Sequence, residues 1–407
     1  MLTLNTSTKN FVSLFILKFF QIGTNFILLP FLIRKLGPEG YGHITYANSI
    51  IVYFTILVTY GFNYSSVHAI ATAKRDYIKI TKIVNTVFSA KIYLIFLSIL
   101  IILLLSHLFS SISQNIKLIY CYFLLVVGDS IFPQFFFQGI QQMDKISKIN
   151  IGIKLCGLLL IVLFVHADND ILLVPFFIGM TSIIGGYYGY IVMKKSILGY
   201  SFRLMSVVAV RKAMITSTPY FLVNIAATIK DRTSSVLIAS CISYSLAAYY
   251  EIAQKVVLFM ATGIGILGQV FYPIFATHVD VKRERRIFSL FLLSGVILCL
   301  ILIGGSKFIY YYLGGKEAVP YYQLIDILAF SLLFLSLSTY WGTLKIGASG
   351  HGKSFSRGVF GGLIIYFLGV VVLFVLDKIS VYTLSWLYVL ANFSEMLCFF
   401  FLKKKLY

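Results

Sequence analysis

Long apolar runs separated by short polar segments make up almost the whole chain. Two of the longest runs are residues 92–106 and 288–304, and runs of similar character recur from one end of the sequence to the other. A helix needs about 20 mostly apolar residues to cross the hydrocarbon core of a bilayer. The pattern therefore predicts an all-α polytopic membrane protein with about 12 transmembrane helices, at residues 10–33, 43–70, 83–106, 116–139, 149–165, 171–193, 214–239, 247–275, 287–309, 321–346, 359–376 and 380–402.

Composition supports a membrane protein over a soluble one. Of the 407 residues, 59% are hydrophobic and 12% are charged, and the mean hydropathy is +0.92. Soluble domains are usually about 45–50% apolar and about 25% charged. A transmembrane β-barrel is not expected, because barrel strands alternate apolar and polar residues, whereas these runs are continuous.

The net charge is +20, and most basic residues lie in the loops between the apolar runs. This position indicates membrane topology rather than a nucleic-acid-binding surface, so no nucleic acid partner is expected. One set of loops carries 21 basic residues, and the alternate set carries five. Basic loops usually face the cytoplasm. The asymmetry predicts that both termini are cytoplasmic, together with loops 71–82, 141–150, 194–213, 276–286 and 347–358.

A faint internal repeat suggests two halves. Leu32, Tyr46 and Ala47 align with Ile238, Ile252 and Ala253 at an offset of 206 residues. Transporters often contain such repeats, with a substrate site between them near the middle of the membrane. We therefore expect two six-helix bundles, residues 1–200 and 201–407, joined by the basic loop 194–213.

Ionisable residues within spans are costly and are candidate functional residues. Among the cations in the predicted spans, six are candidates: Lys18, Lys91, Lys154, Lys230, Arg232 and Lys255. The carboxylates identified there number four: Asp129, Asp231, Glu251 and Asp326. A positive surplus in low dielectric favours an anionic ligand such as phosphate or pyrophosphate.

Depth separates the cations. At about 1.5 Å per residue, Lys154 lies only about 8 Å from a span end, where its side chain can reach the interface. Lys18, Lys230 and Lys255 lie deeper. We predict that these three, with Arg232, line a common cavity and bind pyrophosphate, and we include Lys91 among the candidates.

The carboxylates leave two interpretations open. Glu251 and Lys255 are spaced i,i+4 and can form a structural ion pair, and Asp231 can pair with its neighbours Lys230 and Arg232. Alternatively, at least one of Asp129, Asp231 and Glu251 exchanges a proton during transport.

Signatures of enzymes and cofactors are weak. The six histidines form no HExxH motif, and no Walker-type nucleotide motif is present. The five cysteines all lie in apolar runs without metal-ligand spacing, so they are interpreted as packing residues. We expect no catalytic residues, no metal and no cofactor other than a coupling proton or sodium ion.

Several segments together resemble a known family. The loop 34–42 reads RKLGPEGYG, span 116–139 ends in PQFFFQG, and residues 248–255 read AYYEIAQK. These motifs, in this order and in a chain of this length, resemble the Wzx-type O-antigen flippases. That family belongs to the multidrug/oligosaccharidyl-lipid/polysaccharide exporter superfamily.

The resemblance implies two six-helix bundles around a V-shaped central cavity. It implies a flippase in the bacterial cytoplasmic (inner) membrane that moves an undecaprenyl-pyrophosphate-linked oligosaccharide from the inner to the outer leaflet. It also implies cationic residues at Lys18 and Lys255, and work beside a polysaccharide polymerase and chain-length machinery. The rivals are a cation-coupled multidrug antiporter of the same fold, with Asp129 as its best carboxylate, and a membrane polysaccharide polymerase or ligase.

Overall fold

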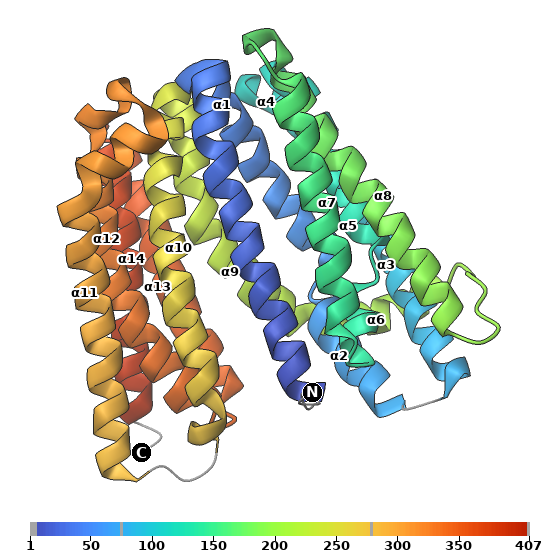
Figure 1. Cartoon of the computed structure of the whole chain (residues 1–407). Helices are drawn as coiled ribbons and strands as arrows, with labels where there is room; N and C mark the ends of the chain where they lie inside the picture. The colour runs from blue at the N-terminus through green and yellow to red at the C-terminus, as the bar shows by residue number, and fades with distance from the viewer. Residues whose placement is uncertain (1–5, 74–75, 277–279, 405–407) are drawn as a thin grey trace, which may run out of the picture. The chain divides into compact units, whose positions relative to one another are not determined.

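A computed structural model describes the backbone of residues 6–73, 76–276 and 280–404, with side chains from residue 26 onward and at residues 20, 23 and 24. Over these residues the chain is helical, with no strand. Figure 1 shows the long helices. Their bounds are α1 Thr6–Thr59, α2 Phe62–Ala73, α3 Tyr77–Leu108, α4 Ser110–Gln114, α5 Ile116–Ile131, α6 Gln134–Gly139, α7 Met143–Phe164, α8 Leu173–Ser196, α9 Val207–Cys241, α10 Tyr244–Phe275, α11 Val281–Gly314, α12 Gln323–Ser338, α13 Gly352–Val375 and α14 Val381–Lys404, with short segments η1 Asp168–Leu172, η2 Lys316–Tyr321 and η3 Thr339–Gly347.

Ten helical stretches within the described residues are long and apolar enough to cross a membrane. Helix α9 is not among them, although it is 35 residues long, and it carries Lys230, Asp231 and Arg232. Helix α1 is interrupted at Gly37, whose φ of 68° and ψ of 169° are not helical. Counting α9 and dividing α1 at Gly37 gives the twelve helices that the sequence predicts.

The chain divides into two compact units, Met1–Ile225 and Ala226–Tyr407. The N-terminal unit holds α1 to α8 and the first part of α9. The C-terminal unit holds the rest of α9 and α10 to α14. The boundary thus lies inside a continuous helix, beyond the loop that the sequence suggests as the linker.

Glycines allow α5 and α8 to pack closely in the N-terminal unit. A Cβ atom at Gly186 on α8 would meet the carbonyl oxygen of Gly128 on α5. A Cβ at Gly128 would in turn meet Ser182. Any larger side chain at either position would push the two helices apart, so this contact fixes the distance between them.

The loop between α8 and α9 lies against α3. Asn85 Nδ2 donates a hydrogen bond to the Ser201 carbonyl oxygen at 3.0 Å. The Met205 amide donates to Ser89 Oγ at 2.9 Å. The basic segment 194–213 is expected to be a loop. Only residues 197–206 of it are non-helical, because α8 and α9 extend into the two ends of the segment.

The segment 71–82 is also shorter as a loop than the hydropathy pattern suggests. Helix α3 already begins at Tyr77, and the Asp76 carboxylate accepts a hydrogen bond from the Lys79 amide at 3.0 Å. This hydrogen bond holds the pKa of Asp76 below its ordinary value. Such caps start helices in water-facing segments, where apolar periodicity gives no signal.

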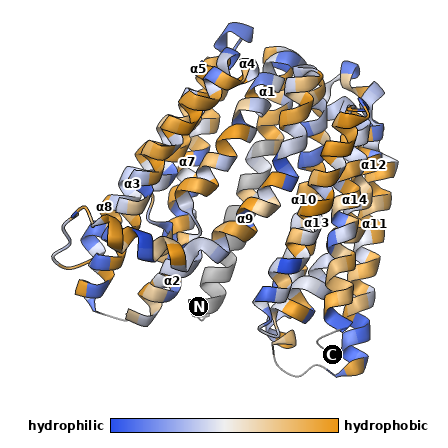
Figure 2. Ribbon diagram, turned by 180° about the vertical axis from the view of Figure 1, so that it is seen from behind, coloured by the Kyte–Doolittle hydropathy of each residue, from blue (hydrophilic) through white to orange (hydrophobic). Residues whose placement is uncertain are grey.

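In the C-terminal unit, α12 packs against α10, α11 and α14, and α13 packs against α14. The aromatic ring of Phe399 on α14 fills the space left by Gly342 and Gly358, where any Cβ atom would meet it. Hydrophobic residues run along the helices, whereas hydrophilic residues gather toward many of the helix ends (Figure 2).

Candidate functional site

The densest group of buried charges lies in the C-terminal unit, around the middle of α9. Lys230, Asp231 and Arg232 are consecutive, and consecutive residues on a helix point in different directions, about 100° apart. The three side chains therefore reach different neighbours. We call these three residues, their side-chain partners on α10 and α14, and Lys255 on α10 the charged network.

Lys230 forms the most buried contact of the charged network. Its Nζ atom lies 2.5 Å from Glu395 Oε2 and 2.9 Å from Asn392 Oδ1, both on α14. The side chains of Lys230 and Glu395 are 8% and 12% exposed. A buried ion pair with an additional hydrogen bond is a costly group to disrupt, because either charge alone would remain without compensation.

Glu251 on α10 is shared between two cations. Arg232 Nη1 lies 3.2 Å and 3.4 Å from its two carboxylate oxygens. Lys255 Nζ lies 3.6 Å from Glu251 Oε1. The i,i+4 ion pair between Glu251 and Lys255, one of the two interpretations of the sequence, is thus present in the structure. Glu251 is almost fully enclosed, while Arg232 and Lys255 remain 20% and 27% exposed.

Asp231 is held by hydrogen bonds from two helices. Tyr388 on α14 donates its hydroxyl to Asp231 Oδ1 at 3.2 Å. Gln254 on α10 donates its side-chain amide to the Asp231 backbone carbonyl. Gln254 also accepts a hydrogen bond from Ser235 at 3.4 Å. These contacts bind α9 to both neighbours at the level of the charges.

Glu395 is a fifth carboxylate within the predicted spans, and it changes the charge balance. It lies in the span expected at residues 380–402, so the rarity of charges within spans would have identified it. Its pairing with Lys230 corrects the expectation of uncompensated positive charge around α9. Within the charged network, three cations (Lys230, Arg232 and Lys255) balance three carboxylates (Asp231, Glu251 and Glu395).

The charged residues of the N-terminal unit have partners of a different kind. Lys91 on α3 is 2% exposed, and its Nζ atom donates to the Ser130 carbonyl oxygen at 3.1 Å. The same atom lies 5.9 Å and 5.4 Å from the ring centroids of Phe88 and Phe135. The ammonium group thus sits between a carbonyl oxygen and two aromatic rings, which attract cations.

The carbonyl that Lys91 reaches lies in the last turn of α5, near Pro133. The next amide that would ordinarily bond to Ser130 is that of Gln134, which donates to Phe132 instead. A cation at the C-terminal end of a helix is favourable because the carbonyl oxygens there lack partners. Lys91 therefore has a structural role, and its part in substrate binding stays a prediction.

Asp129, on the same helix, faces a small cavity inside the N-terminal unit. The cavity has a volume of about 120 Å³ and is lined by Asp129, Asn150 and Lys154, among other residues. Asp129 Oδ1 accepts a hydrogen bond from Ser182 Oγ on α8 at 3.1 Å. This arrangement offers oxygen atoms and one amine in a confined space.

Comparison with known proteins places this architecture in a family. Residues 7–279, more than half of the chain, match the model of the family described as "Polysaccharide biosynthesis protein". The chain belongs to the polysaccharide biosynthesis protein family. This match confirms the Wzx-type resemblance that the motifs suggest.

Two curated relatives of this family are distant in sequence but cover most of the chain. A protein of Escherichia coli (strain K12) named "Putative O-antigen transporter" is 24% identical over 349 residues, covering 82% of this chain and 83% of that protein. A protein of Shigella dysenteriae with the same name is 23% identical, covering 97% and 99%. Each match therefore covers most of both chains.

Solved structures show the same fold. The lipid II flippase MurJ in an inward closed conformation has a TM-score of 0.69 at 14% identity, covering 96% of this chain and 86% of that one. The eukaryotic MATE transporter AtDTX14 has a TM-score of 0.65 at 12% identity, covering 98% and 96%. These similarities confirm the expected fold class of a polytopic helical membrane protein.

The predicted site residues of this protein are divided between its two units. It brings Lys230, Asp231, Arg232, Glu251 and Lys255 into the one charged network. Lys91 and Asp129 lie in the N-terminal unit, each with its own partners. Lys18 belongs to α1, but its side chain lies outside the described residues. A common cavity that contains Lys18 with the α9 and α10 cations stays a prediction.

Among residues 26–73, 76–276 and 280–404, no three His, Cys, Asp or Glu side chains are grouped as metal ligands. Within the charged network the carboxylates contact lysine, arginine or tyrosine side chains instead. The charged network is therefore held together by ion pairs and hydrogen bonds.

Proposed function

We propose that this protein is a transporter that moves a lipid-linked oligosaccharide across the bacterial cytoplasmic (inner) membrane. Its substrate would be an undecaprenyl-pyrophosphate-linked repeat unit of O-antigen or a similar polysaccharide. The direction would be from the inner to the outer leaflet, by alternating access. In this proposal the chain catalyses no covalent step and works beside a polysaccharide polymerase and chain-length machinery.

The observation that carries the proposal is the family match over residues 7–279. Two further observations support it. The curated relatives are named for O-antigen transport, and a flippase named for lipid II has the same fold. These names describe transport rather than sugar-transferring chemistry.

The charged network suggests how a pyrophosphate group would be held. Arg232 and Lys255 are the more exposed cations and share one carboxylate, that of Glu251. A diphosphate offers more oxygen acceptors than one carboxylate and forms strong charge-assisted hydrogen bonds. In the proposed mechanism it replaces Glu251 as the partner of Arg232 and Lys255, while Lys230 stays paired with Glu395. Lys18 and Lys91 are further candidate contacts.

Displacement of Glu251 would also supply coupling. A carboxylate that loses both cationic partners inside a low-dielectric site is costly in its charged form. In the proposal at least one of the coupling candidates Asp129, Asp231 and Glu251 exchanges a proton during transport. Sodium in place of the proton is the alternative driving ion.

A cation-coupled multidrug antiporter is the second candidate function. One observation favours it, namely the exposure of Asp129 to the small cavity of the N-terminal unit. In this alternative Asp129 binds the coupling cation, and the charged network of the C-terminal unit is only structural. The two functions differ in what accumulates when the protein is absent.

The test is deletion of the gene in its native host, followed by mass spectrometry of lipid-linked sugars. The proposal predicts accumulation of complete lipid-linked repeat units, restored to normal by the wild-type gene. No accumulation, together with increased sensitivity to cationic drugs, would show the antiporter instead. If the protein were a polymerase or ligase, its deletion would cause repeat units to accumulate at the outer leaflet. Impermeant glycan-binding probes would then reach them on spheroplasts.

A charge exchange tests the site within the same assay. In the double variant Glu251→Lys with Lys255→Glu, a structural ion pair is preserved but its cation moves by one helical turn. We expect this variant to insert normally and to lose export, because the cation no longer meets the phosphate. Arg232→Lys should retain more export than Arg232→Gln. Full export by the exchanged variant would remove Lys255 from the site.

Orientation is the remaining part of the proposal. Both termini would face the cytoplasm, with loops 71–82, 194–213 and 276–286 on the same side. Single cysteines placed in these loops, in a background without native cysteines, should resist an impermeant thiol reagent in intact cells. Labelling from outside would reverse the proposed orientation.

A further inference from the structure

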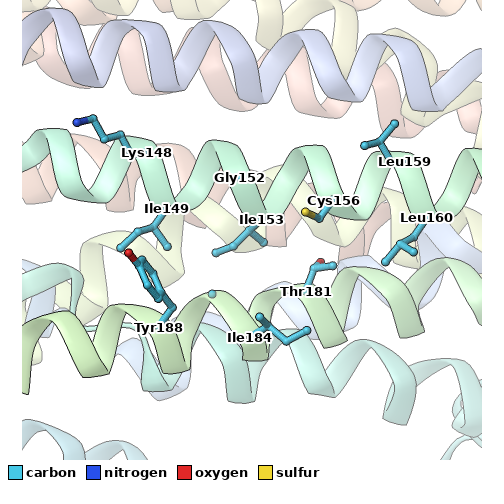
Figure 3. A pocket seen from close by; sticks show the side chains of 11 residues that line it. Lys148, Ile149, Gly152, Ile153, Cys156, Leu159, Leu160, Thr181, Ile184 and Tyr188 are labelled. Carbon is cyan, nitrogen blue, oxygen red and sulfur yellow. The ribbon is translucent and has the colours of Figure 1, made fainter.

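An apolar groove runs between α7 and α8 of the N-terminal unit (Figure 3). Its volume is about 770 Å³, which lies within the range of about 300–1,000 Å³ typical of small-molecule sites. Its walls include Ile149, Ile153 and Leu160 from α7 and Ile184 from α8. The proposed sugar-transport function uses none of these residues.

Glycines create the groove at its centre. A Cβ atom at Gly185 on α8 would meet the side chain of Ile153, so α7 and α8 approach closely there. A Cβ atom at Gly152 on α7 would meet nothing within 4 Å. The first glycine therefore brings the helices together, and the second leaves space beside their contact.

The groove is open on its outer side, and the residues along this opening are largely apolar. Leu159, Ile184 and Tyr188 are 56%, 63% and 57% exposed. Cys156 and Gly152 are exposed as well. In the hydrocarbon region of a membrane, exposed apolar surface contacts lipid chains rather than water. A hydrocarbon chain is therefore the chemistry that suits this groove.

The ends of the groove differ in charge. Lys148 and Tyr188 lie at one end, and Leu159 and Leu160 lie at the other (Figure 3). Lys195 lies seven residues beyond Tyr188, in the last turn of α8, and adds positive charge toward the Lys148 end. An exposed lysine at the edge of an apolar surface extends its ammonium group toward lipid headgroups.

The length of the groove selects the lipid. From Lys148 to Leu160 the helix rises roughly 18 Å at 1.5 Å per residue. That is close to the depth of one leaflet, about half of the ~30 Å hydrocarbon core. A glycerophospholipid acyl chain matches one leaflet, whereas a polyisoprenyl chain is much longer.

We propose that the groove between α7 and α8 binds one acyl chain of an anionic glycerophospholipid, whose phosphate lies at Lys148. The lipid belongs to the leaflet at the Lys148 end. It is a bound component of the N-terminal unit and is separate from the transported molecule. The inference does not depend on which substrate the protein transports.

The experiment uses the full-length protein, purified in mild detergent and examined by native mass spectrometry with added lipid. The probes are phosphatidylglycerol and phosphatidylethanolamine with the same acyl chains. One phosphatidylglycerol molecule should be retained in preference, by about fivefold, since a basic residue near a membrane surface attracts an anionic lipid to about that extent.

Two substitutions separate the chain site from the headgroup site. Gly152→Leu fills the groove without meeting another atom of the protein at its Cβ position. It should abolish retention of phosphatidylglycerol. Lys148→Gln leaves the groove intact and should remove the preference between the two lipids, while one lipid is still retained.

Matched controls exist in the C-terminal unit. Gly304 lies on α11, is exposed, and likewise has nothing within 4 Å of an added Cβ atom. Gly304→Leu should retain the lipid as wild type does. Lys282 is an exposed basic residue in the first turn of α11, and Lys282→Gln should keep the headgroup preference. Thermal melts of all four variants check that each is folded.

Three outcomes would overturn the proposal. Equal retention of both lipids by the wild-type protein would show only non-specific surrounding lipid. Unchanged retention in a folded Gly152→Leu variant would place the lipid elsewhere. If undecaprenyl phosphate, added as a third probe, were retained in preference to phosphatidylglycerol and lost in Gly152→Leu, the groove would bind a polyisoprenyl chain instead.

Discussion

Charged residues within the helices have different partners in the two units. In the C-terminal unit, Lys230, Arg232 and Lys255 each contact a carboxylate within 4 Å. In the N-terminal unit, Lys91 contacts a carbonyl oxygen and two aromatic rings, and Asp129 contacts a serine hydroxyl. One unit pairs its cations with carboxylates in direct contact, while in the other the hydrogen-bond partners of Lys91 and Asp129 are uncharged groups.

The difference separates two possible roles for a buried cation. An ion pair can exchange its carboxylate for another anion, since both partners remain charged and the geometry is set by side chains. A cation bound to a backbone carbonyl has no anion to exchange, and its removal exposes a helix end. We infer that ligand exchange belongs to the charged network and that Lys91 mainly holds α3 against α5.

The largest expected effect is from Lys230→Ala. It leaves Glu395 charged and buried without its cation, which should lower the free energy of unfolding by about 3–5 kcal/mol. Thermal melts followed by size-exclusion chromatography measure the loss. The double variant Lys230→Met with Glu395→Gln removes both charges and should be clearly more stable than the single variant. A single variant as stable as wild type would show that the pair contributes nothing.

A smaller loss is expected from Lys91→Met in the N-terminal unit. Methionine keeps the contacts with Phe88 and Phe135, because its sulfur also packs well against rings. The hydrogen bond to the Ser130 carbonyl and the attraction of the ammonium group to the rings are lost, and leaving a buried acceptor unpaired costs about 1–3 kcal/mol. The same melting assay measures it. A loss as large as that of Lys230→Ala would contradict the distinction between the two units.

Export activity sharpens the same comparison. Lys91→Met should retain export in proportion to the folded protein present in the membrane. Arg232→Gln should lose export while its folded amount stays near wild type. Loss of export in a fully folded Lys91→Met variant would return Lys91 to the substrate site.

The helices could be predicted from the sequence because lipid demands long apolar segments with internally bonded backbones. The same rule identified Lys230, Asp231, Arg232, Glu251 and Lys255 as unusual, since charges in spans are rare. It predicts that such residues need partners, and the i,i+4 spacing already suggests one pair on α10.

Most of the pairing could not be predicted from the sequence. Lys230 and Glu395 are 165 residues apart, and only the packing of α9 on α14 brings them together. The carbonyl bound by Lys91 is available because the chain breaks near Pro133, and a proline alone does not reveal which carbonyl loses its partner. Hydropathy likewise does not show that the unit boundary lies within α9.

The smallest expected losses of stability come from removing two hydroxyl groups, one in each unit, that donate hydrogen bonds to carboxylates. Ser182 donates to Asp129 at 3.1 Å, and Tyr388 donates to Asp231 at 3.2 Å. Ser182→Ala and Tyr388→Phe each remove that donor with little change in shape. Neither carboxylate is fully buried, so we expect losses near the net contribution of an ordinary hydrogen bond, about 0.5–1.5 kcal/mol.

We expect Ser182→Ala to cost the upper part of that range and Tyr388→Phe the lower part. Asp231 keeps its cationic neighbours Lys230 and Arg232 along the chain, whereas no ion pair to Asp129 within 4 Å is found among the described side chains. Paired melts of the two variants, with Ser240→Ala as an exposed-serine control whose hydroxyl bonds only locally, test the order. If Tyr388→Phe were the more damaging, the cations beside Asp231 would not compensate its charge, and the pairing ascribed to the C-terminal unit would be limited to Glu251 and Glu395.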